Sequence, residues 1–152
     1  IMTDLIKSEV VGAWGKITLN SPRTYNALNA EMATEISRLL DLWQKDESIS
    51  AVMIDSELEK AFCAGGDVVS LYKLAKSGEV ETARSFFSKE YALDLKIHEY
   101  KKPIIVFGNA IVMGGGVGIH NGASHRIMTD KTSFAMPEVT IGFFPDVGAS
   151  YF

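Results

Sequence analysis

Two runs rich in β-branched residues open the chain. They lie at residues 6–11 and 16–20 and flank the turn-like sequence Gly-Ala-Trp-Gly at residues 12–15. This arrangement predicts a β-hairpin with a four-residue connection. Ser21-Pro22-Arg23 then ends the second strand, because proline cannot donate a hydrogen bond to a neighbouring strand.

Apolar residues recur with helical spacing after Asn29. The spacing predicts a helix that is capped by Asn29 or Asn26 and extends to about Lys45. The residues expected on its buried face are Met32, Ile36, Leu39, Leu40 and Trp43. Residues 50–55 form a short apolar run, which predicts a buried strand.

Strands and helices continue to alternate in the second half of the chain. Helices are predicted over residues 68–75 and 79–100, and strands over residues 104–108 and 125–128. A short helix is expected after the glycine-rich residues 113–118. The longer helix is expected to turn its apolar and aromatic residues inward: Phe86, Phe87, Tyr91, Leu93 and Ile97.

The alternation of strands and helices predicts an α/β domain built in layers. A chain of 152 residues is long enough to bury a sizeable core, so we expect one domain over residues 1–152. The chain shows no internal repeat, low-complexity tract or linker that would argue for a second domain.

Composition and charge narrow the classes of function. Asp and Glu number 19 against 15 Lys and Arg, with no basic run, so nucleic acid is not an expected partner. No apolar run is long enough to span a bilayer, and the first residues lack a signal-peptide pattern. A single cysteine, Cys63, excludes an internal disulfide and fits a reducing compartment. We therefore expect a soluble intracellular protein, cytoplasmic or, in a eukaryote, in the mitochondrial matrix.

Metal and thiol chemistry have little support in the sequence. The three histidines, His98, His120 and His125, are not spaced like zinc ligands, and no CxxC occurs. Cys63 lies between Phe62 and Ala64, which favours a buried small side chain over a reactive thiolate. No metal is therefore expected.

Two carboxylates near the end of the chain are candidates for acid–base chemistry. Glu138 and Asp146 lie in an otherwise apolar stretch with glycine and proline hinges. Desolvation raises the pKa of a carboxyl, and a neighbouring like charge adds to the effect, so two acids in one apolar pocket titrate apart. One can then act as a base and the other as an acid or an orienting group. Composition alone fits equally well with a helix cap at Glu138 and a turn at Asp146.

Two glycine-rich turns each follow an apolar strand and precede a helix. They are Gly65-Gly66-Asp67 and Gly114-Gly115-Gly116. Amide groups at helix N-termini are unpaired, and two such termini facing each other would form an oxyanion hole, worth about 3–4 kcal/mol per donor. Tight helix–strand packing is the simpler explanation for either turn alone. A phosphate loop is disfavoured, because Asn121 stands where G-x-G-x-x-G needs its third glycine.

Four motifs in order resemble the crotonase (enoyl-CoA hydratase/isomerase) superfamily. They are Asn20-x-Pro22-x-x-x-Asn26-Ala27-Leu28, the Ala-Phe-Cys-Ala-Gly-Gly-Asp of residues 61–67, the Met-Gly-Gly-Gly-Val-Gly of residues 113–118, and Pro137-Glu138. Together they span nearly the whole chain, which makes the resemblance more specific than any one motif. Residues 62–67, and Glu138 followed by Phe-Pro-Asp-Val-Gly at residues 144–148, resemble the 3-hydroxyisobutyryl-CoA hydrolase branch.

The resemblance implies a fold and a substrate. The fold is a crotonase-like spiral of ββα units, with helices packed on small sheets and an acyl-CoA thioester bound between the two glycine turns. The implied reaction is hydrolysis of a short 3-hydroxyacyl-CoA, such as 3-hydroxyisobutyryl-CoA in valine catabolism. Coenzyme A is then part of the substrate, and no further cofactor is expected. Family members run well beyond residue 152, so we expect a C-terminal region to be absent from this chain. We also expect association with that segment or with a second copy.

The resemblance also assigns roles to residues. The amides of Gly66 and Gly115 would donate hydrogen bonds to the thioester oxygen. Glu138 would act as nucleophile or as general base on water, and Asp146 would assist proton transfer or hold the substrate hydroxyl. Glu90 resembles the family's other acidic substrate contact, although by itself it fits a solvated acid.

Contacts with coenzyme A are implied for a segment near the start of the chain. The coenzyme would run past Arg23, Thr24 and Tyr25, mostly along their backbone.

Two other activities remain open within the resemblance. Hydratases of the superfamily carry a second catalytic glutamate at the position of Gly118, so addition of water by two glutamates is not expected here. Double-bond isomerisation needs only one carboxylate and stays an alternative. A catalytically silent crotonase-fold module used for binding or assembly is a third reading.

Overall fold

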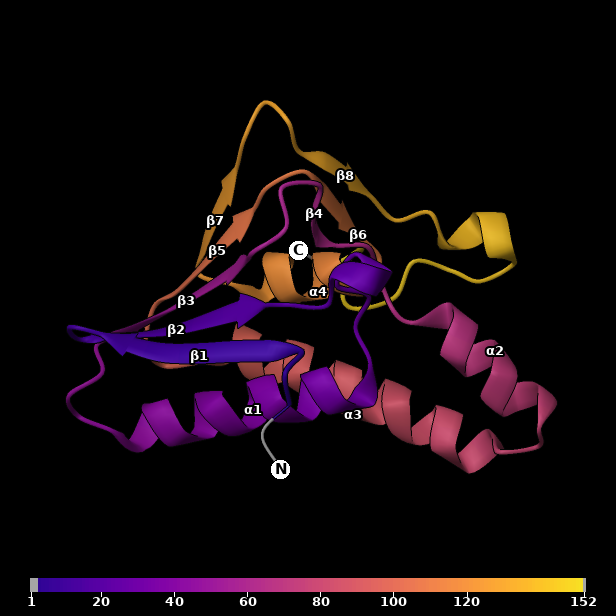
Figure 1. Cartoon of the computed structure of the whole chain (residues 1–152), viewed down its shortest axis with the longest axis horizontal. Coiled ribbons are helices and arrows are strands. Elements are labelled where there is room, and N and C mark those ends of the chain that lie inside the picture. Colours follow the sequence, from indigo (N-terminus) through magenta and orange to yellow (C-terminus); the bar gives the residue numbers. More distant parts are fainter. Residues whose placement is uncertain (1–2, 152) are drawn as a thin grey trace.

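A five-stranded sheet is the framework of the structure, a computed structural model that describes residues 3–151 (Figure 1). Its strand order is β1-β2-β3-β5-β7, and all neighbouring pairs are parallel except β1 and β2. The five strands are β1 (Ile6–Val11), β2 (Trp14–Leu19), β3 (Ala51–Ser56), β5 (Ile104–Gly108) and β7 (His125–Met128).

A second sheet consists of three short parallel strands in the order β4-β6-β8. These strands are β4 (Ala61–Cys63), β6 (Ile111–Met113) and β8 (Ser133–Ala135). Each one follows a strand of the larger sheet along the chain and precedes a helix, so the chain repeats a ββα unit. The helical elements are η1 (Pro22–Thr24), α1 (Ala30–Lys45), α2 (Val68–Lys76), α3 (Val80–His98), α4 (Gly115–Gly122) and η2 (Glu138–Ile141).

The predicted hairpin is confirmed, but its predicted four-residue connection is wrong. Val11 pairs with Trp14, so the turn contains only Gly12 and Ala13. Gly15 instead lies inside β2. The ring of Trp43 packs directly on it, so a Cβ atom at this position would overlap the indole. The glycine is therefore a packing site for α1 and not part of a turn.

Helix α1 agrees with the prediction. Asn29 caps it, since its side chain accepts a hydrogen bond from the amide of Met32 at 2.9 Å. In Figure 1 this helix and α3 run along the same side of the large sheet. The predicted inward residues are all buried: Met32, Ile36, Leu39, Leu40 and Trp43.

The predicted inward face of α3 is only partly correct. Phe86, Leu93 and Ile97 are buried, but Tyr91 is 39% exposed. The buried face of α3 includes Glu90 and Asp94 in place of Tyr91. Phe86, Glu90 and Asp94 are each four residues apart, so they lie on the same face of the helix. Tyr91 lies one residue off this face.

Asn26 connects three parts of the chain around the first glycine turn. Its side-chain oxygen accepts a hydrogen bond from the Ser21 amide at 2.6 Å, and its nitrogen donates to the Phe62 carbonyl at 2.9 Å and to the Ser56 hydroxyl at 2.8 Å. Asn26 is fully buried and has a positive φ of 57°. It does not cap α1, but it fixes the end of β4 and so the turn that follows.

We expect Asn26→Ala to lower the free energy of unfolding by about 2–4 kcal/mol, because it leaves a buried amide and a buried carbonyl without partners. Asn29→Ala is the matched control and should cost only about 1 kcal/mol, the usual value of an N-cap. Urea denaturation followed by circular dichroism measures both. Equal losses in the two variants would contradict the role given to Asn26.

Candidate active site

A cavity of about 670 Å³ opens where the parallel strands of the small sheet end. The segments that follow β4, β6 and β8 all contribute to its wall, because the carboxyl ends of parallel strands lie at one edge of a sheet. Five of the residues proposed from sequence line it: Gly66, Glu90, Gly115, Glu138 and Asp146.

The two glycine turns are in direct contact. A Cβ atom built on Gly115 would lie 3.4 Å from the Gly66 amide nitrogen, and one on Gly114 would lie 3.3 Å from the Gly65 Cα. Gly65 and Gly114 have φ values of 125° and 48°, which favour glycine.

The amides of Gly66 and Gly115 are available to a ligand. Within residues 3–151 neither N–H donates a hydrogen bond to another group. Gly115 is the first residue of α4, where the amide has no acceptor inside the helix. Two adjacent free donors are what an oxyanion hole requires.

Glu138 lies beside the second turn, as the first residue of η2. A Cβ atom on Gly114 would lie 2.8 Å from its Oε1, so the absence of a side chain there makes room for the carboxyl. Its Oε2 is buried and has no hydrogen-bond partner in the described part of the chain. Burial and then Asp146 raise the pKa of Glu138 above its usual range, an environment suited to a general base.

Glu90 is 3% exposed, so the reading of it as a solvated acid is wrong. Its Oε1 occupies the space that a side chain on Gly115 would take. Burial, followed by the charges of Asp146 and Glu138, raises the pKa of Glu90 to about 8. This shift favours the protonated form of Glu90, which can donate a hydrogen bond.

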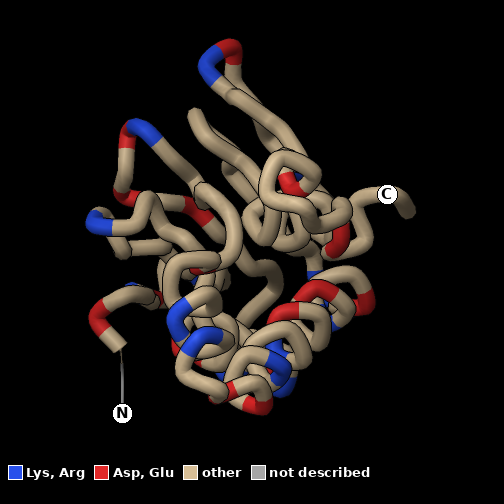
Figure 2. Tube along the Cα trace, turned by 90° about the vertical axis from the view of Figure 1, so that its right-hand side faces the viewer, with Lys and Arg blue, Asp and Glu red and all other residues tan. Residues whose placement is uncertain are grey.

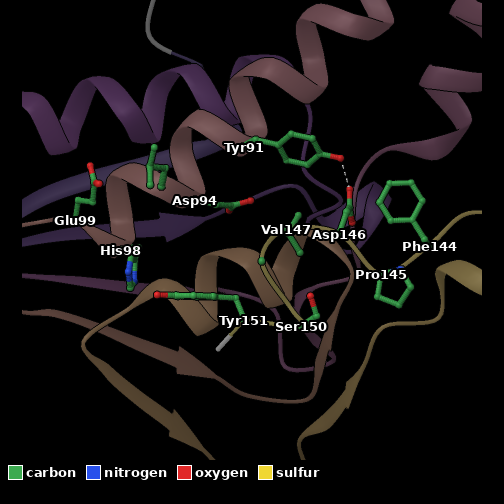
Figure 3. Close-up of a pocket in the computed structure, with 12 residues that line it drawn as sticks. Tyr91, Asp94, His98, Glu99, Phe144, Pro145, Asp146, Val147, Ser150 and Tyr151 are labelled. Atoms are coloured by element: carbon green, nitrogen blue, oxygen red, sulfur yellow. Dashed lines mark hydrogen bonds between the residues drawn. The ribbon is translucent and has the colours of Figure 1, made fainter.

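The structure adds two residues that the sequence did not suggest as site residues. Tyr91 and Asp94 line a neighbouring cavity of about 630 Å³, which Asp146 also lines. The Tyr91 hydroxyl donates a hydrogen bond to Asp146 Oδ2 at 2.6 Å (Figure 3). Asp94 is 7% exposed, and neither carboxyl oxygen has a partner among the described residues. Its oxygens lie 2.6 and 2.8 Å from where a Cβ atom on Gly118 would be. The sequence signal was the helical period that runs through Glu90 and Asp94.

The family follows from comparison with known proteins. Residues 14–152 match the family model described as enoyl-CoA hydratase/isomerase. The chain belongs to the enoyl-CoA hydratase/isomerase family.

Relatives in this family carry different names. The 3-hydroxyisobutyryl-CoA hydrolase, mitochondrial, of Danio rerio is 46% identical over 144 residues, which cover 95% of this chain and 37% of the relative. The small ribosomal subunit protein mS47 of Neurospora crassa is also 46% identical, over 138 residues that cover 90% of this chain and 27% of the relative. The crystal structure of a carnitinyl-CoA dehydratase from Mycobacterium thermoresistibile is 42% identical and has a TM-score of 0.94, over 98% of this chain and 44% of that chain.

These comparisons confirm the resemblance and the fold expected from it. The repeated ββα unit and the two small sheets are those of the crotonase fold. The chain spans less than half the length of each of the three relatives. Relatives with the same sequence identity to this chain carry unrelated names. Sequence identity alone therefore does not indicate which activity the chain has, so an activity must be inferred from the residues of the site.

The segment proposed to follow coenzyme A lies outside the cavity wall. Arg23, Thr24 and Tyr25 are exposed, and none of them lines the 670 Å³ cavity. They are nevertheless next to the first turn, because the Tyr25 carbonyl accepts a hydrogen bond from the Ala64 amide at 3.0 Å.

The structure gives little support for thiol or metal chemistry near the cavity. Cys63 is fully buried, which raises the pKa of its thiol to about 12, so it is the buried small side chain expected. Among residues 3–151 no group of three His, Cys, Asp or Glu side chains could hold a metal ion. Figure 2 shows Lys and Arg interspersed with Asp and Glu along the trace. No helix in the described part of the chain is long and apolar enough to cross a bilayer.

Asp94 gives a test of the site's electrostatics. Burial, then the charges of Glu90 and Asp146, raises the pKa of Asp94 to about 8. A carboxyl whose pKa rises on folding stabilises the protein fully below its unfolded pKa, near 4, and this contribution is lost as the pH rises through about 8. We therefore expect Asp94→Asn to become more stable relative to wild type, by about 1–3 kcal/mol, between pH 5 and pH 8.5.

Urea denaturation at several pH values measures this difference. Asp130→Asn, which changes an exposed acid in the turn after β7, is the matched control. A difference between wild type and Asp94→Asn that is the same at all pH values would contradict the assigned protonation.

Proposed function

We propose that this site hydrolyses a short 3-hydroxyacyl-CoA thioester, such as 3-hydroxyisobutyryl-CoA. One observation carries the proposal: the half-buried Glu138 carboxyl, whose buried Oε2 has no partner among the described residues, stands beside two adjacent free amides in one cavity. Acyl transfer needs these two elements, an activated oxygen and a stabiliser for the oxyanion. The name of the Danio rerio relative supports the choice of acyl group.

The oxyanion hole consists of the Gly66 and Gly115 amides. Attack on the thioester carbon moves negative charge to the carbonyl oxygen, and both N–H groups then donate stronger hydrogen bonds than in the ground state. Loss of one such donor typically raises the activation free energy of the reaction by about 3–4 kcal/mol.

Glu138 supplies the activated oxygen by one of two routes. As general base it removes a proton from water, whose oxygen adds to the thioester carbon. As nucleophile it forms a transient anhydride that water then hydrolyses. On either route the carbon–sulfur bond breaks, the sulfur leaves with the electron pair and takes up a proton, and the products are a carboxylic acid and free coenzyme A. Asp146, in the same cavity, assists proton transfer or holds the substrate hydroxyl.

The remaining contacts follow from the surroundings of the two turns. Protonated Glu90, in contact with the second turn, is proposed to donate a hydrogen bond to the acyl group. Coenzyme A is proposed to pass Arg23, Thr24 and Tyr25, beside the first turn. Hydrolysis by this route requires no metal or other cofactor, because the amides and carboxyls supply both functions. Association with further polypeptide and an intracellular location stay predictions.

A second candidate is another reaction of an acyl-CoA in the same cavity, hydration or double-bond isomerisation. The name of the Mycobacterium thermoresistibile structure favours it. Against hydration stands Gly118, where the family's second glutamate is missing and the space is taken by the Asp94 carboxyl. Loss of the enoyl absorbance of crotonyl-CoA, measured beside release of free thiol from 3-hydroxyisobutyryl-CoA, separates the two reactions. A silent binding module, suggested by the Neurospora crassa relative's name, would show neither.

Glu138→Gln should lower kcat for release of free coenzyme A by about 10²–10⁴-fold, since the amide can neither attack nor accept a proton. Glu81→Gln, an exposed change near the start of α3, is the matched control and should keep wild-type turnover. Turnover by Glu138→Gln at the wild-type rate would show that this residue is not the activated oxygen.

A further inference from the structure

The loop that carries Asp146 is held against α3 by a row of aromatic rings. The Phe143 ring centroid lies 6.0 Å from that of Phe87 and 4.4 Å from that of Phe144. Phe87 in turn lies 5.9 Å from Tyr91, one turn further along α3. Aromatic pairs at these separations attract each other beyond the effect of the area they bury. The loop is thus docked on the same helix that carries Glu90.

The backbone after Asp146 is not in a relaxed conformation. Val147 is 5% exposed and has a φ of 47°, which is rare for a β-branched residue, and Gly148 has a φ of 73°. Such conformations persist where surrounding contacts hold them and are common at functional sites. The direction of the Asp146 side chain therefore depends on contacts with the rest of the protein.

Tyr91 provides the one hydrogen bond found on the Asp146 carboxyl within residues 3–151. The 2.6 Å length is in the range of a strong bond from a hydroxyl to a carboxylate. It engages Oδ2, while Oδ1 makes no hydrogen bond to the described residues and stays available to a ligand. Figure 3 shows the Tyr91 ring reaching from α3 towards Asp146.

We propose that Tyr91 is a positioning residue, which fixes the Asp146 carboxyl so that its free oxygen meets the substrate or the proton in transit. The inference rests on the proposed hydrolysis, because it gives Tyr91 a role only through Asp146. Tyr91 itself is not assigned any contact with the reacting atoms.

The simplest alternative is that Tyr91 only anchors the loop through its ring. Tyr91→Phe separates the two, since it keeps the ring contact with Phe87 and removes only the hydroxyl. In the full-length natural protein we expect this variant to lower kcat for hydrolysis of 3-hydroxyisobutyryl-CoA by about 10-fold, with a smaller change in KM. In an Asp146→Ala background the same change should have no further effect, because the group it positions is gone.

Tyr100→Phe is the matched control. The Tyr100 hydroxyl also makes a short hydrogen bond, 2.7 Å to the Leu40 carbonyl. Tyr100 lines neither the 670 Å³ cavity nor the neighbouring cavity that Tyr91 and Asp146 share. This variant should lower the unfolding midpoint and leave kcat near the wild-type value.

The outcomes distinguish the two proposals. Equal losses from Tyr91→Phe in the wild-type and Asp146→Ala backgrounds, or wild-type kcat in Tyr91→Phe, would overturn the positioning role and leave hydrolysis standing. Absence of thiol release from the wild-type protein would overturn the proposed function and, with it, this inference.

Discussion

Parallel pairing of three very short strands is the constraint on which the site depends. β4, β6 and β8 pair side by side, with Ala61 opposite Ile111 and Ile111 opposite Ser133. Each strand ends at the same edge, and the segment beyond each end carries one part of the site. The first turn, the second turn and Glu138 thus meet although they lie far apart in the sequence. The rest of the fold, including the larger sheet and the buried hydrogen bonds of Asn26, holds this edge in place.

The contact between α3 and α4 places acids where glycines leave room. A side chain on Gly115 would overlap Glu90, and one on Gly118 would crowd Asp94. No cation within residues 3–151 pairs with either carboxyl. Burial, followed by the charges of neighbouring carboxylates, raises the pKa of both groups and so favours their neutral forms. Uncompensated polar groups of this kind cost stability, which is the usual exchange between stability and activity at a functional site.

Most long elements of this fold could be predicted from the sequence, because their patterns extend over many residues. The helix ending at Lys45 and its cap at Asn29 follow from apolar spacing and one capping residue. The strands of the small sheet could not be predicted in this way, since three residues are too few to show an alternation. Tyr91 was predicted to be buried and Asp94 was not singled out at all, because an aromatic residue is usually buried and an acid is usually exposed. This helix reverses both tendencies. From the residues alone, the glycine turns and the pair Glu138 and Asp146 were ambiguous, and only their combination in one ordered resemblance made them a site.

The repeated ββα unit has a consequence for how such proteins diversify. Each repeat delivers one loop to a common edge, and the strands that fix the edge are separate from the residues that the loops display. The residues of a single loop can therefore change, and with them the chemistry of the site, while the loops of the neighbouring repeats retain theirs. An architecture of this kind accommodates relatives named as a hydrolase, a dehydratase and a ribosomal subunit protein without any redesign of its scaffold.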